Sequence, residues 1–471
     1  MNELRLTLKW VAEAVGGRML SGDPDQNIGQ VTTDSRTLGH GDFFVALKGP
    51  RFDGHEYLGE VIAKGGRGAI VEPNGGNKKA DAERSQGFAL IEVADTTKAL
   101  QDLAHAVRKA SGTKVVAITG SAGKTTTKET IAQLLAARFR VVKNKGNLNN
   151  HIGLPLSLMQ LRERPDVAVM ELGMNHAGEI STLVAIAEPE VRVWTNVGDA
   201  HIGFFRSADE IAEAKAEILE RAEPNHLLVC NADDPRVMSH ASRFPGRRLT
   251  FGTVAGAMVR ATGIEDLGLE GMRAKVSTPA GVFSLQTALL GRGNLANTLA
   301  AAAVGIEFNV DLSDIASAIA KMNAAERRGA VRRLANGITL IDDSYNSSPT
   351  ALKRTLEVLA NESRAQRKVA VLGEMLELGE HSTSLHRESG EFAAKAGVDL
   401  LCAIGGEPAR ALAEAAVKAG MSATAVHHFD NSEAAAAAIA AVIRPGDVIL
   451  VKGSRGTRAD IVTDRIVAEH G

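Results

Sequence analysis

The stretch that most constrains the fold of this chain is residues 115–135, VVAITGSAGKTTTKETIAQLL. It begins with an apolar run, 115–118, which has the length of one buried strand of a parallel sheet. A turn with Gly120 and Gly123 follows, and Lys124 then stands at the head of a segment whose apolar side chains recur with the period of a helix. The stretch therefore predicts a strand, a glycine-rich turn and a helix in direct succession.

Such a turn can hold phosphate, because glycines let backbone N–H groups approach the ligand and the helix N-terminus faces its negative charge. Lys124 would reach the outer phosphates of a nucleotide, and Thr125 could ligate Mg²⁺. Ile118 stands five residues before Gly123, so TGSAGKTT is a shorter form than the common GxxxxGK[ST]. The alternative, a glycine-rich helix start without a ligand, leaves the lysine and three threonines unexplained. The predicted phosphate-binding residues are Gly120, Ser121, Ala122, Gly123, Lys124, Thr125 and Thr126.

The composition excludes several classes of function. Lys and Arg number 54 and Asp and Glu 56, so the net charge is −2 and gives no electrostatic case for nucleic acid or an anionic membrane. Cys230 and Cys402 lie in apolar, strand-like settings and are expected to be buried free thiols in a reducing compartment. There is no apolar signal region at the N-terminus and no run of membrane-spanning length. We expect a cytoplasmic protein without membrane insertion or a nucleic-acid partner.

The length of 471 residues is enough for about three domains. Residues 1–95 predict a small α/β domain. Residues 96–322 alternate near-continuous apolar strands with helices, which is typical of a mostly parallel sheet. Residues 323–471 repeat the alternation and predict a Rossmann-like domain without a GxGxxG turn. The expected fold class is α/β with three domains.

A few elements are predicted in more detail. The first domain should hold a helix over 6–17, a strand over 43–47 and an exposed loop over 73–87. A helix over 96–110 should be capped by Asp95 or Thr96. The Ala-rich run 434–441 predicts a helix rather than disorder.

Polar residues collect just past the carboxyl ends of the predicted strands, where open α/β sheets bind ligands. A carboxylate and an imidazole there, Glu171 and His201, could ligate Mg²⁺ near the phosphates, although Mg²⁺ prefers oxygen ligands. The full set is Glu171, Asn196, Asp199, His201 and Asn231 in the middle domain and Asp342, Asp343, Lys452 and Arg455 in the third.

Several candidates also have plainer interpretations. His201 could equally be a hydrogen-bonded loop residue. Lys215, on the predicted helix DEIAEAKAEILERA, is most simply a surface lysine among glutamates. Asn294 and Asn297, in GRGNLANTLAAAA, could cap a helix or read a purine edge.

Two arginine-containing segments also leave alternatives open. Arg327 and Arg328 begin the third domain and could form a hinge surface or a clamp on a phosphate. Ser35 and Arg36 could bind a phosphate, but a turn made by Asp34 with a surface arginine is the simpler interpretation.

Taken together, these motifs resemble those of the Mur ligases, the ATP-dependent amino-acid ligases of peptidoglycan precursor synthesis. TGSAGKTT is similar to the family's short P-loop, and ELGMN with Glu171, the His201 loop, NLAN at 294–297, Arg328 and Asp343 follow in the family's order. Within the family, the chain is most similar to the member that adds a D-alanyl-D-alanine dipeptide. The segments that carry this are GDFFVALKGPRFDGHEYL, GNLNNHIGLPLSL, ELGMNHAGEI, LIDDSYNSSP, GEMLELGE and LVKGSRG.

The resemblance implies ATP and Mg²⁺ as cofactors, UDP-N-acetylmuramoyl-tripeptide and D-Ala-D-Ala as substrates, and a monomeric enzyme. It implies that Lys215 is carbamylated, since CO₂ on its amine gives an anionic oxygen ligand that Mg²⁺ accepts. The implied catalytic residues are Lys124, Glu171, His201 and Lys215, and the implied metal ligands are Thr125, Glu171, His201 and carbamylated Lys215. The further nucleotide contacts are Asn294, Asn297, Arg328 and Asp343. The implied substrate contacts are Ser35, Arg36, Lys48, Asn149, Asn150, Asn346, Lys452 and Arg455.

Three positions depart from the family's pattern. Gly293 stands where a His usually precedes the adenine-site Asn, His151 follows GNLNN where Glu or Asp is usual, and Glu374 stands where Asp is commoner. The motif Asp-Asn-Pro-Arg, which recognises a diamino acid in a related ligase, is absent, and this favours dipeptide addition.

The implied reaction is attack of the tripeptide's terminal carboxylate on the γ-phosphate of ATP, followed by attack of the D-Ala-D-Ala amine on the acyl phosphate. One alternative is another Mur-type or folylpolyglutamate-type ligase. An alternative of a different class is a P-loop nucleotide-binding protein that does not ligate, which would not need Glu171, His201 and Lys215.

Overall fold

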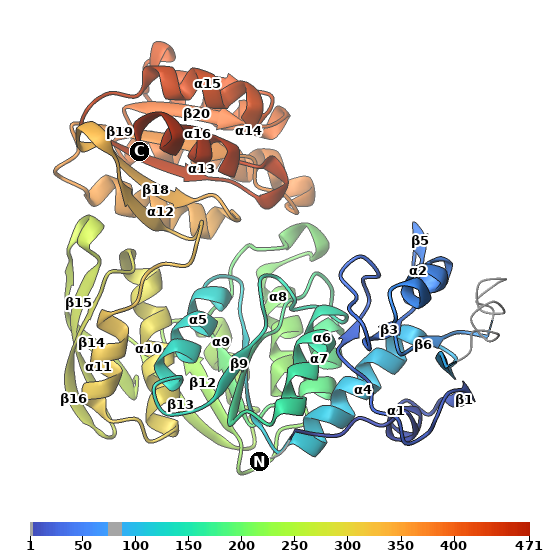
Figure 1. The fold of residues 1–471 in the computed structure, drawn as a ribbon. Coiled ribbons are helices and arrows are strands. Elements are labelled where there is room, and N and C mark those ends of the chain that lie inside the picture. The colour runs from blue at the N-terminus through green and yellow to red at the C-terminus, as the bar shows by residue number, and fades with distance from the viewer. Residues whose placement is uncertain (1–2, 74–86) are drawn as a thin grey trace. The chain divides into compact units, whose positions relative to one another are not determined.

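The computed structural model describes residues 3–73 and 87–471, and these fall into two compact units (Figure 1). Unit 1 comprises residues 1–117 and 138–191, and unit 2 comprises residues 118–137 and 192–471. The loop predicted over 73–87 lies almost wholly outside the described residues. Among the described helices, none combines the length and the hydropathy that a membrane crossing requires.

Unit 1 contains a five-stranded sheet in the order β1-β7-β6-β3-β2, in which only β1 runs antiparallel to its neighbour. Alternate residues of β3 and β6, such as Phe44, Ala69 and Val71, share one face and pack against α2. The predicted strand over 43–47 is confirmed and ends at Val45. The bounds are β1 (Arg18–Ser21), β2 (Val31–Thr32), β3 (Phe43–Val45), α2 (Leu58–Ala63), β6 (Gly68–Val71) and β7 (Ala89–Glu92), with a hairpin of β4 (Lys48–Gly49) and β5 (Phe52–Asp53).

Two helices of unit 1 confirm the sequence prediction. Helix α1 (Leu8–Ala14) starts at Thr7, whose hydroxyl accepts a hydrogen bond from the backbone N–H of Trp10. Helix α4 (Thr96–Ser111) starts at Asp95, whose carboxylate accepts from the N–H groups of Thr97 and Lys98 at 2.7 and 2.9 Å. Of the two candidate caps, Asp95 is therefore the one used.

The second part of unit 1 pairs β9 (Val141–Lys143) in parallel with β10 (Val167–Glu171). All five residues of β10 are buried, which explains the continuous apolar run before Glu171. Helices α6 (Gly153–Leu158) and α7 (Glu179–Ala187) accompany these strands.

In unit 2, the middle part of the chain contributes strands in the order β16-β15-β14-β13-β12-β11. Strands β12, β13 and β14 are parallel, but β14, β15 and β16 are antiparallel and were not anticipated from the sequence. Buried and exposed residues alternate along β15 and β16, and this period of two is the sequence pattern that indicates such strands. The bounds are β8 (Lys114–Thr119), β11 (Val191–Trp194), β12 (Leu227–Asn231), β13 (Arg247–Gly252), β14 (Val259–Asp266), β15 (Met272–Thr278) and β16 (Gly281–Thr287).

Small residues bring the helices of this part close together. In α10 (Gly291–Glu307), the alanines at 300–303 are fully buried, and a Cβ on Gly305 would lie 2.9 Å from Leu134 of α5 (Lys124–Leu135). Figure 1 shows α10 and α11 (Leu312–Ala320) beside β14, β15 and β16. The close approach brings the last turns of α10 and α5 together. The remaining helices here are α8 (Ala208–Ala216) and α9 (Pro235–Ala241).

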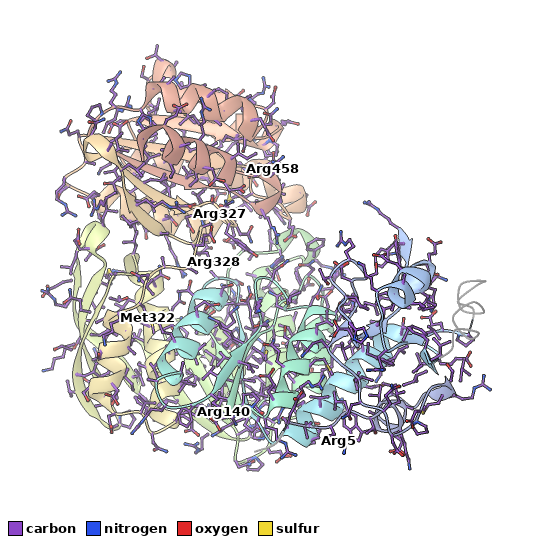
Figure 2. The ribbon with its side chains drawn as sticks, viewed as in Figure 1. Arg5, Arg140, Met322, Arg327, Arg328 and Arg458 are labelled. Carbon is purple, nitrogen blue, oxygen red and sulfur yellow. The ribbon has the colours of Figure 1, made fainter. Side chains whose placement is uncertain are left out.

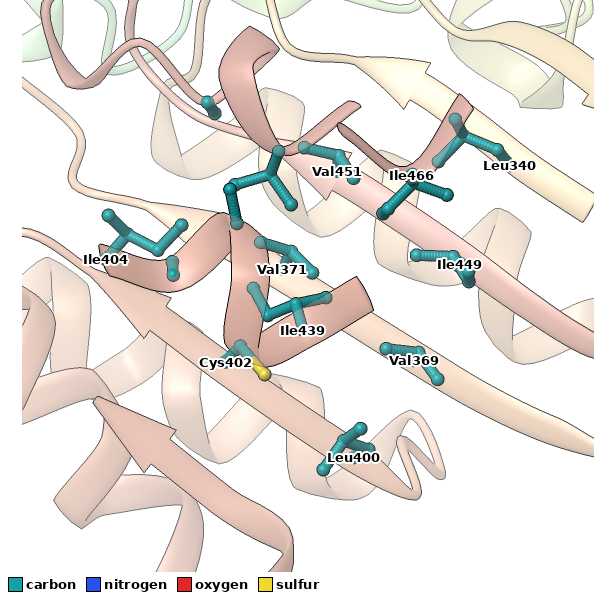
Figure 3. Packing of buried hydrophobic residues seen from close by; sticks show 14 of the residues in the cluster. Leu340, Val369, Val371, Leu400, Cys402, Ile404, Ile439, Ile449, Val451 and Ile466 are labelled. Atoms are coloured by element: carbon teal, nitrogen blue, oxygen red, sulfur yellow. The ribbon is translucent and has the colours of Figure 1, made fainter. Parts of the chain in front are cut away.

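The C-terminal part of unit 2 is a six-stranded sheet in the order β17-β18-β22-β19-β20-β21, parallel except for β17. Val369 and Val371 of β19 pack against Ile439 of α15 and Ile466 of α16 in one apolar core (Figure 3). Helix α15 (Ser432–Val442) confirms the prediction for 434–441. The other bounds are β17 (Ala330–Arg333), β18 (Thr339–Asp343), α12 (Pro349–Asn361), β19 (Arg367–Gly373), α13 (Ser382–Lys395), β20 (Leu400–Ile404), α14 (Glu407–Lys418), β21 (Val426–Phe429), β22 (Asp447–Lys452) and α16 (Asp460–His470).

Candidate active site

The turn between β8 and α5 has the backbone that a phosphate cradle needs. Gly120 and Gly123 have φ of 149° and 83°, which side-chain-bearing residues rarely adopt. A Cβ on Gly120 would lie 1.9 Å from the hydroxyl of Thr195, and one on Gly123 would lie 2.3 Å from Oδ1 of Asn297. Only glycine therefore fits at either position.

Neighbouring backbone and side chains hold this turn in shape. The N–H of Ala122 donates to the side-chain oxygen of Asn196 at 2.9 Å, and the hydroxyl of Ser121 donates to the carbonyl of Gly198. Lys124 folds back so that its Nζ donates to the carbonyl of Gly120 at 2.8 Å. No side chain caps the N-terminus of α5, so the helix start keeps its positive end for an anion.

Lys215 is the position at which the simpler sequence interpretation is wrong. The side chain lies at the end of α8 and is only 1% exposed, so it is not a surface lysine. Burial first, and the charge of Lys124 second, hold the pKa of Lys215 well below its usual value. Among the described residues, none forms an ion pair or hydrogen bond with its amine. A buried lysine without a partner favours the neutral amine, which is the form that reacts as a nucleophile.

His201 lies in the loop after β11 and has left-handed backbone, with φ of 67°. Its Nδ1 lies 2.6 Å from a carboxylate oxygen of Glu377, outside the angles of a regular hydrogen bond. Burial first lowers the pKa of this imidazole; Glu377 opposes that shift, and Lys124 and Lys215 add to it. Lys124, His201 and Lys215 thus share one electrostatic environment within unit 2.

The asparagines of α10 do not cap the helix. The helix begins at Gly291, after Leu290, and has no side-chain cap. Asn294 donates to the carbonyl of Leu290 at 2.9 Å, and Asn297 donates to Asn294 at 3.0 Å and lies against Gly123. The capping interpretation is therefore wrong, and Asn297 contacts the phosphate turn directly.

Two arginines, both labelled in Figure 2, stand at the start of the C-terminal part and have different partners. Arg327 forms ion pairs with Asp460 and Asp464 of α16. The Arg328 guanidinium instead lies 4.0 Å from the ring centre of Tyr345, and no described carboxylate pairs with it. Arg327 is thus held by carboxylates, whereas Arg328 lies over an aromatic ring.

Four further candidates lie at or just past the carboxyl ends of β18 and β22. The amine of Lys452, largely buried, donates to Asp343 at 2.6 Å and to the carbonyl of Asn346 at 3.0 Å. Arg455 lies 5.8 Å from the ring of Tyr345. Lys452 therefore fixes the loop that carries Asp343 and Asn346.

In unit 1, Glu171 ends β10 and is 4% exposed. Its side chain accepts a hydrogen bond from Asn149 at 2.8 Å, and its backbone N–H donates to Asn144 at 3.0 Å. The side chain of Asn150 instead accepts from the N–H of Gly153 at the start of α6. The GNLNN segment thus orients the Glu171 carboxylate with one asparagine side chain and starts a helix with another.

The other unit 1 candidates lie near the first sheet. Asp34 accepts hydrogen bonds from the backbone and side chain of exposed Arg36, so the turn with a surface arginine is confirmed. The Arg36 hydrogen bond holds the pKa of Asp34 at about 2. Ser35 is buried and donates to Glu60 at 2.8 Å. Lys48 is exposed in the β4–β5 hairpin.

Sequence reasoning missed Glu377 and Tyr345, which contact predicted site residues. Glu377 could have been proposed from the sequence, because it lies in the segment GEMLELGE, which carries part of the family resemblance and had no role assigned to its acidic residues.

A separate cavity of about 560 Å³ lies at the amino ends of β18 and β22 and contains none of the predicted residues. Gly293 leaves little room, because a Cβ there would lie 3.3 Å from Arg354.

Comparison with known proteins places these features in a family. Three family models match: the "Mur ligase family, catalytic domain" over 27–108, the "Mur ligase middle domain" over 118–305 and the "Mur ligase, glutamate ligase domain" over 327–455. The UDP-N-acetylmuramoyl-tripeptide–D-alanyl-D-alanine ligase of Escherichia coli strain K12 is 34% identical over 99% of both chains. A MurF crystal structure from Acinetobacter baumannii has a TM-score of 0.88 at 32% identity, covering 99% of this chain and 100% of that one. A Thermotoga maritima MurF ligase in complex with ADP has a TM-score of 0.80 at 30% identity, covering 93% and 97%.

Proposed function

Because the chain belongs to the Mur ligase family, we propose that it is an ATP-dependent ligase that joins D-alanyl-D-alanine to UDP-N-acetylmuramoyl-tripeptide. The products are the UDP-linked pentapeptide, ADP and phosphate. The observation that carries this proposal is the buried, unpaired Lys215 beside Lys124, in a unit whose phosphate turn admits only glycine. A nucleotide-binding protein that does not ligate has no use for such a lysine.

The residues of the turn bind and orient ATP. Backbone N–H groups of Gly120–Gly123 and the start of α5 would hold the phosphates, with Lys124 on the outer ones. Asn294 and Asn297 would meet the base, and Asp343 and Arg328 would meet the nucleotide when the C-terminal part closes over it. The lack of a carboxylate partner for Arg328 supports this role over one for Arg327.

The proposed magnesium ligands include oxygen donors of the kind that Mg²⁺ accepts. Buried Glu171 offers a carboxylate oriented by Asn149, and Thr125 offers a hydroxyl in the first turn of α5. Among the described residues, no three His, Cys, Asp or Glu side chains gather into a ready metal site. His201 and a carbamate on Lys215 would complete the set. When bound, the metal would neutralise charge on the transferring phosphoryl group.

The carbamate follows from the chemistry of a buried neutral amine. The nitrogen lone pair of Lys215 attacks the carbon of CO₂, forms an N–C bond and releases one proton. Burial disfavours any charge at this position, but the positive charge of Lys124, which disfavours an ammonium here, favours the carbamate anion. The modified side chain then offers oxygen rather than nitrogen.

The reaction needs two displacements. The tripeptide carboxylate attacks the γ-phosphorus of ATP and expels ADP, which leaves an acyl phosphate. The amine of D-Ala-D-Ala attacks that carbonyl, and the tetrahedral intermediate expels phosphate as the amine loses a proton. Lys124 stabilises the charge that builds up on the phosphoryl oxygens, and the closed protein keeps water from the acyl phosphate.

We propose further that residues 1–95 bind the UDP end of the substrate through Ser35, Arg36 and Lys48. The proposed contacts to the peptide parts of the substrates are Asn149, Asn150, Asn346, Lys452 and Arg455. Lys452 would contribute by holding Asp343 in place. Domains at 1–95, 96–322 and 323–471, a monomeric state and a cytoplasmic location complete the proposal.

The test is a direct assay. Purified protein with ATP, Mg²⁺, UDP-N-acetylmuramoyl-tripeptide and D-Ala-D-Ala should give the pentapeptide by mass, and phosphate release should require the tripeptide substrate. Single amino acids in place of the dipeptide should give little product. Faster ligation of a single amino acid would favour a sibling ligase, and ADP formation at the same rate without tripeptide would contradict the acyl-phosphate order.

A further inference from the structure

The loop that follows β19, residues 374–379, is held unusually firmly. Its first N–H groups each have an acceptor, with Glu374 donating to the carbonyl of Ile404 at 2.8 Å and Met375 to Nε2 of His386 at 2.9 Å. The N–H of Leu376 donates to the hydroxyl of Ser454 at 2.9 Å. A loop with this many fixed groups presents its next residue, Glu377, in one position.

Glu377 has the backbone of a functional position. Its φ is 64°, a left-handed conformation that costs a residue with a side chain free energy unless its surroundings impose it. The strain places the Glu377 carbonyl where it accepts the N–H of Gly203 at 2.9 Å. It also places the carboxylate 2.6 Å from Nδ1 of His201.

Two glycines, Gly203 and Gly379, let the loop that follows β11 and the loop that follows β19 come into close contact. A Cβ on Gly203 would lie 2.5 Å from the backbone nitrogen of Gly379, and a Cβ on Gly379 would lie 2.9 Å from the Cα of Gly203. Any other residue at either position would push the two loops apart. The sequence therefore supplies glycine on both sides of one contact.

A second contact joins the loop that contains His201 and Gly203 to the C-terminal part. The hydroxyl of Thr350, in α12, donates to the carboxylate of Asp199 at 2.7 Å. Asp199 lies two residues before His201, so the loop is fixed on both sides of the histidine. Besides Glu377, the titratable groups that act on the imidazole are Lys124 and Lys215, so Glu377 is the carboxylate among them and the group that lies at Nδ1.

We propose that Glu377 is a positioning residue for His201: the carboxylate holds the Nδ1 edge of the ring, so that Nε2 faces the reactants. The inference rests on the proposed function, and it assigns to the GEMLELGE motif a role that links closure of the C-terminal part to the state of the histidine. Because the carboxylate comes from the C-terminal part, the imidazole is oriented only when that part is docked.

The variants Glu377→Ala and Glu377→Gln test this, with Glu380→Ala as the matched control. Glu380 lies three residues away in the same motif, and its side chain is 90% exposed. Glu377→Ala should lower kcat about 10- to 100-fold with a smaller change in the KM for ATP, while Glu377→Gln should recover part of the loss. The control should keep both constants and the melting temperature.

A spectroscopic readout separates positioning from general damage. In ¹⁵N-labelled protein without nucleotide, the ring nitrogens of His201 should report a proton on Nδ1 in the wild type and a shift toward the Nε2 tautomer in Glu377→Ala. Gly203→Ala, which disturbs the same contact from the other loop, should give the same ring signals.

The outcomes are distinct. Loss of kcat with altered His201 signals in Glu377→Ala and Gly203→Ala supports the inference. Unchanged ring signals, or a Glu377→Ala enzyme with the kinetics of Glu380→Ala, overturns it while the ligase proposal stands. Absence of pentapeptide from the wild type overturns the ligase proposal, and the ring signals still decide whether Glu377 orients His201.

Discussion

Two turns of unit 2 each lead from a strand through two glycines into a helix, and they differ in charge. After β8, Gly120 and Gly123 lead into α5, and Lys124 and Thr125 open the helix. After β20, Gly405, with φ of 138°, and Gly406 lead into α14. At the second turn, the carboxylate of Glu374 accepts the N–H of Gly406 at 2.8 Å.

The difference shows that glycines alone do not make an anion site. Both helices offer a positive N-terminus, and glycine allows a close approach in both. At α14 the protein supplies the anion itself, through Glu374. At α5 the first helical residue is Lys124, which adds positive charge. The proposed phosphate site therefore has a cation where the turn before α14 has a carboxylate.

Removing the cation from the first turn should have the largest effect. Lys124→Ala is expected to lower kcat about 100- to 1,000-fold, because the developing charge on the γ-phosphate loses its closest cation. Steady-state kinetics with varied ATP measure this. Lys418→Ala, an exposed lysine at the end of α14, is the control and should behave as wild type. Comparable losses in both variants would contradict the distinction between the turns.

The second prediction concerns Lys215, whose pKa is lowered by burial and by Lys124. Lys215→Met should lose activity about 100-fold or more while raising the free energy of unfolding by at least about 1 kcal/mol, because a buried group that prefers to be charged in water is replaced by an apolar one. Assays with bicarbonate and denaturant titrations without it measure the two effects.

The stability gain has a defined pH dependence. Below the usual lysine pKa of 10.5, the unfolded chain binds a proton that the folded chain refuses, so the wild type loses stability as pH falls through that value. The gain in Lys215→Met should be larger near neutral pH and should shrink as pH rises toward 10.5. A gain that is constant from pH 7.5 to 10 would contradict a neutral buried amine.

The third prediction separates the two arginines of the C-terminal part. Arg328→Leu should raise the KM for ATP about 10-fold with little change in stability, because its charge has no carboxylate partner among the residues that the structure describes. Arg327→Leu should instead destabilise by about 1 kcal/mol or more, because Asp460 and Asp464 lose their cation. Kinetics and thermal melting of the pair measure both, and an exchanged pattern would assign the nucleotide contact to Arg327.

The smallest effect is expected at the second turn. Glu374→Gln should cost about 0.5–1 kcal/mol of stability, because α14 loses the negative charge at its N-terminus. ATP kinetics should not change. A Glu374→Gln protein that binds inorganic phosphate at α14 would show that the glutamate was the sole barrier to a second anion site.

Much of the fold and part of the site follow from local sequence rules. The strand–turn–helix at 115–135, the Asp95 cap and the helix at 434–441 were predicted because each depends on residues close in sequence. The antiparallel strands β14 to β16 were missed, since their alternating pattern was not weighed against the parallel alternation around it.

The rest depends on contacts between distant segments. Local charge pattern made Lys215 a surface residue, and its burial is set by packing that the helix sequence does not reveal. The pairing of His201 with Glu377 joins residues 176 positions apart, so no spacing rule could propose it. Asn294 and Asn297 were suited to capping by type, but the helix begins at Gly291, ahead of both.

The ion pairs of Arg327 reach from the first residues of the C-terminal part to its last helix, α16. They hold the first and last segments of the C-terminal part next to each other. A module with adjoining ends tolerates circular permutation, because joining the old termini with a short linker changes no long-range contact. The C-terminal part should therefore accept new termini in an exposed loop and could be exchanged between related ligases as a single cassette.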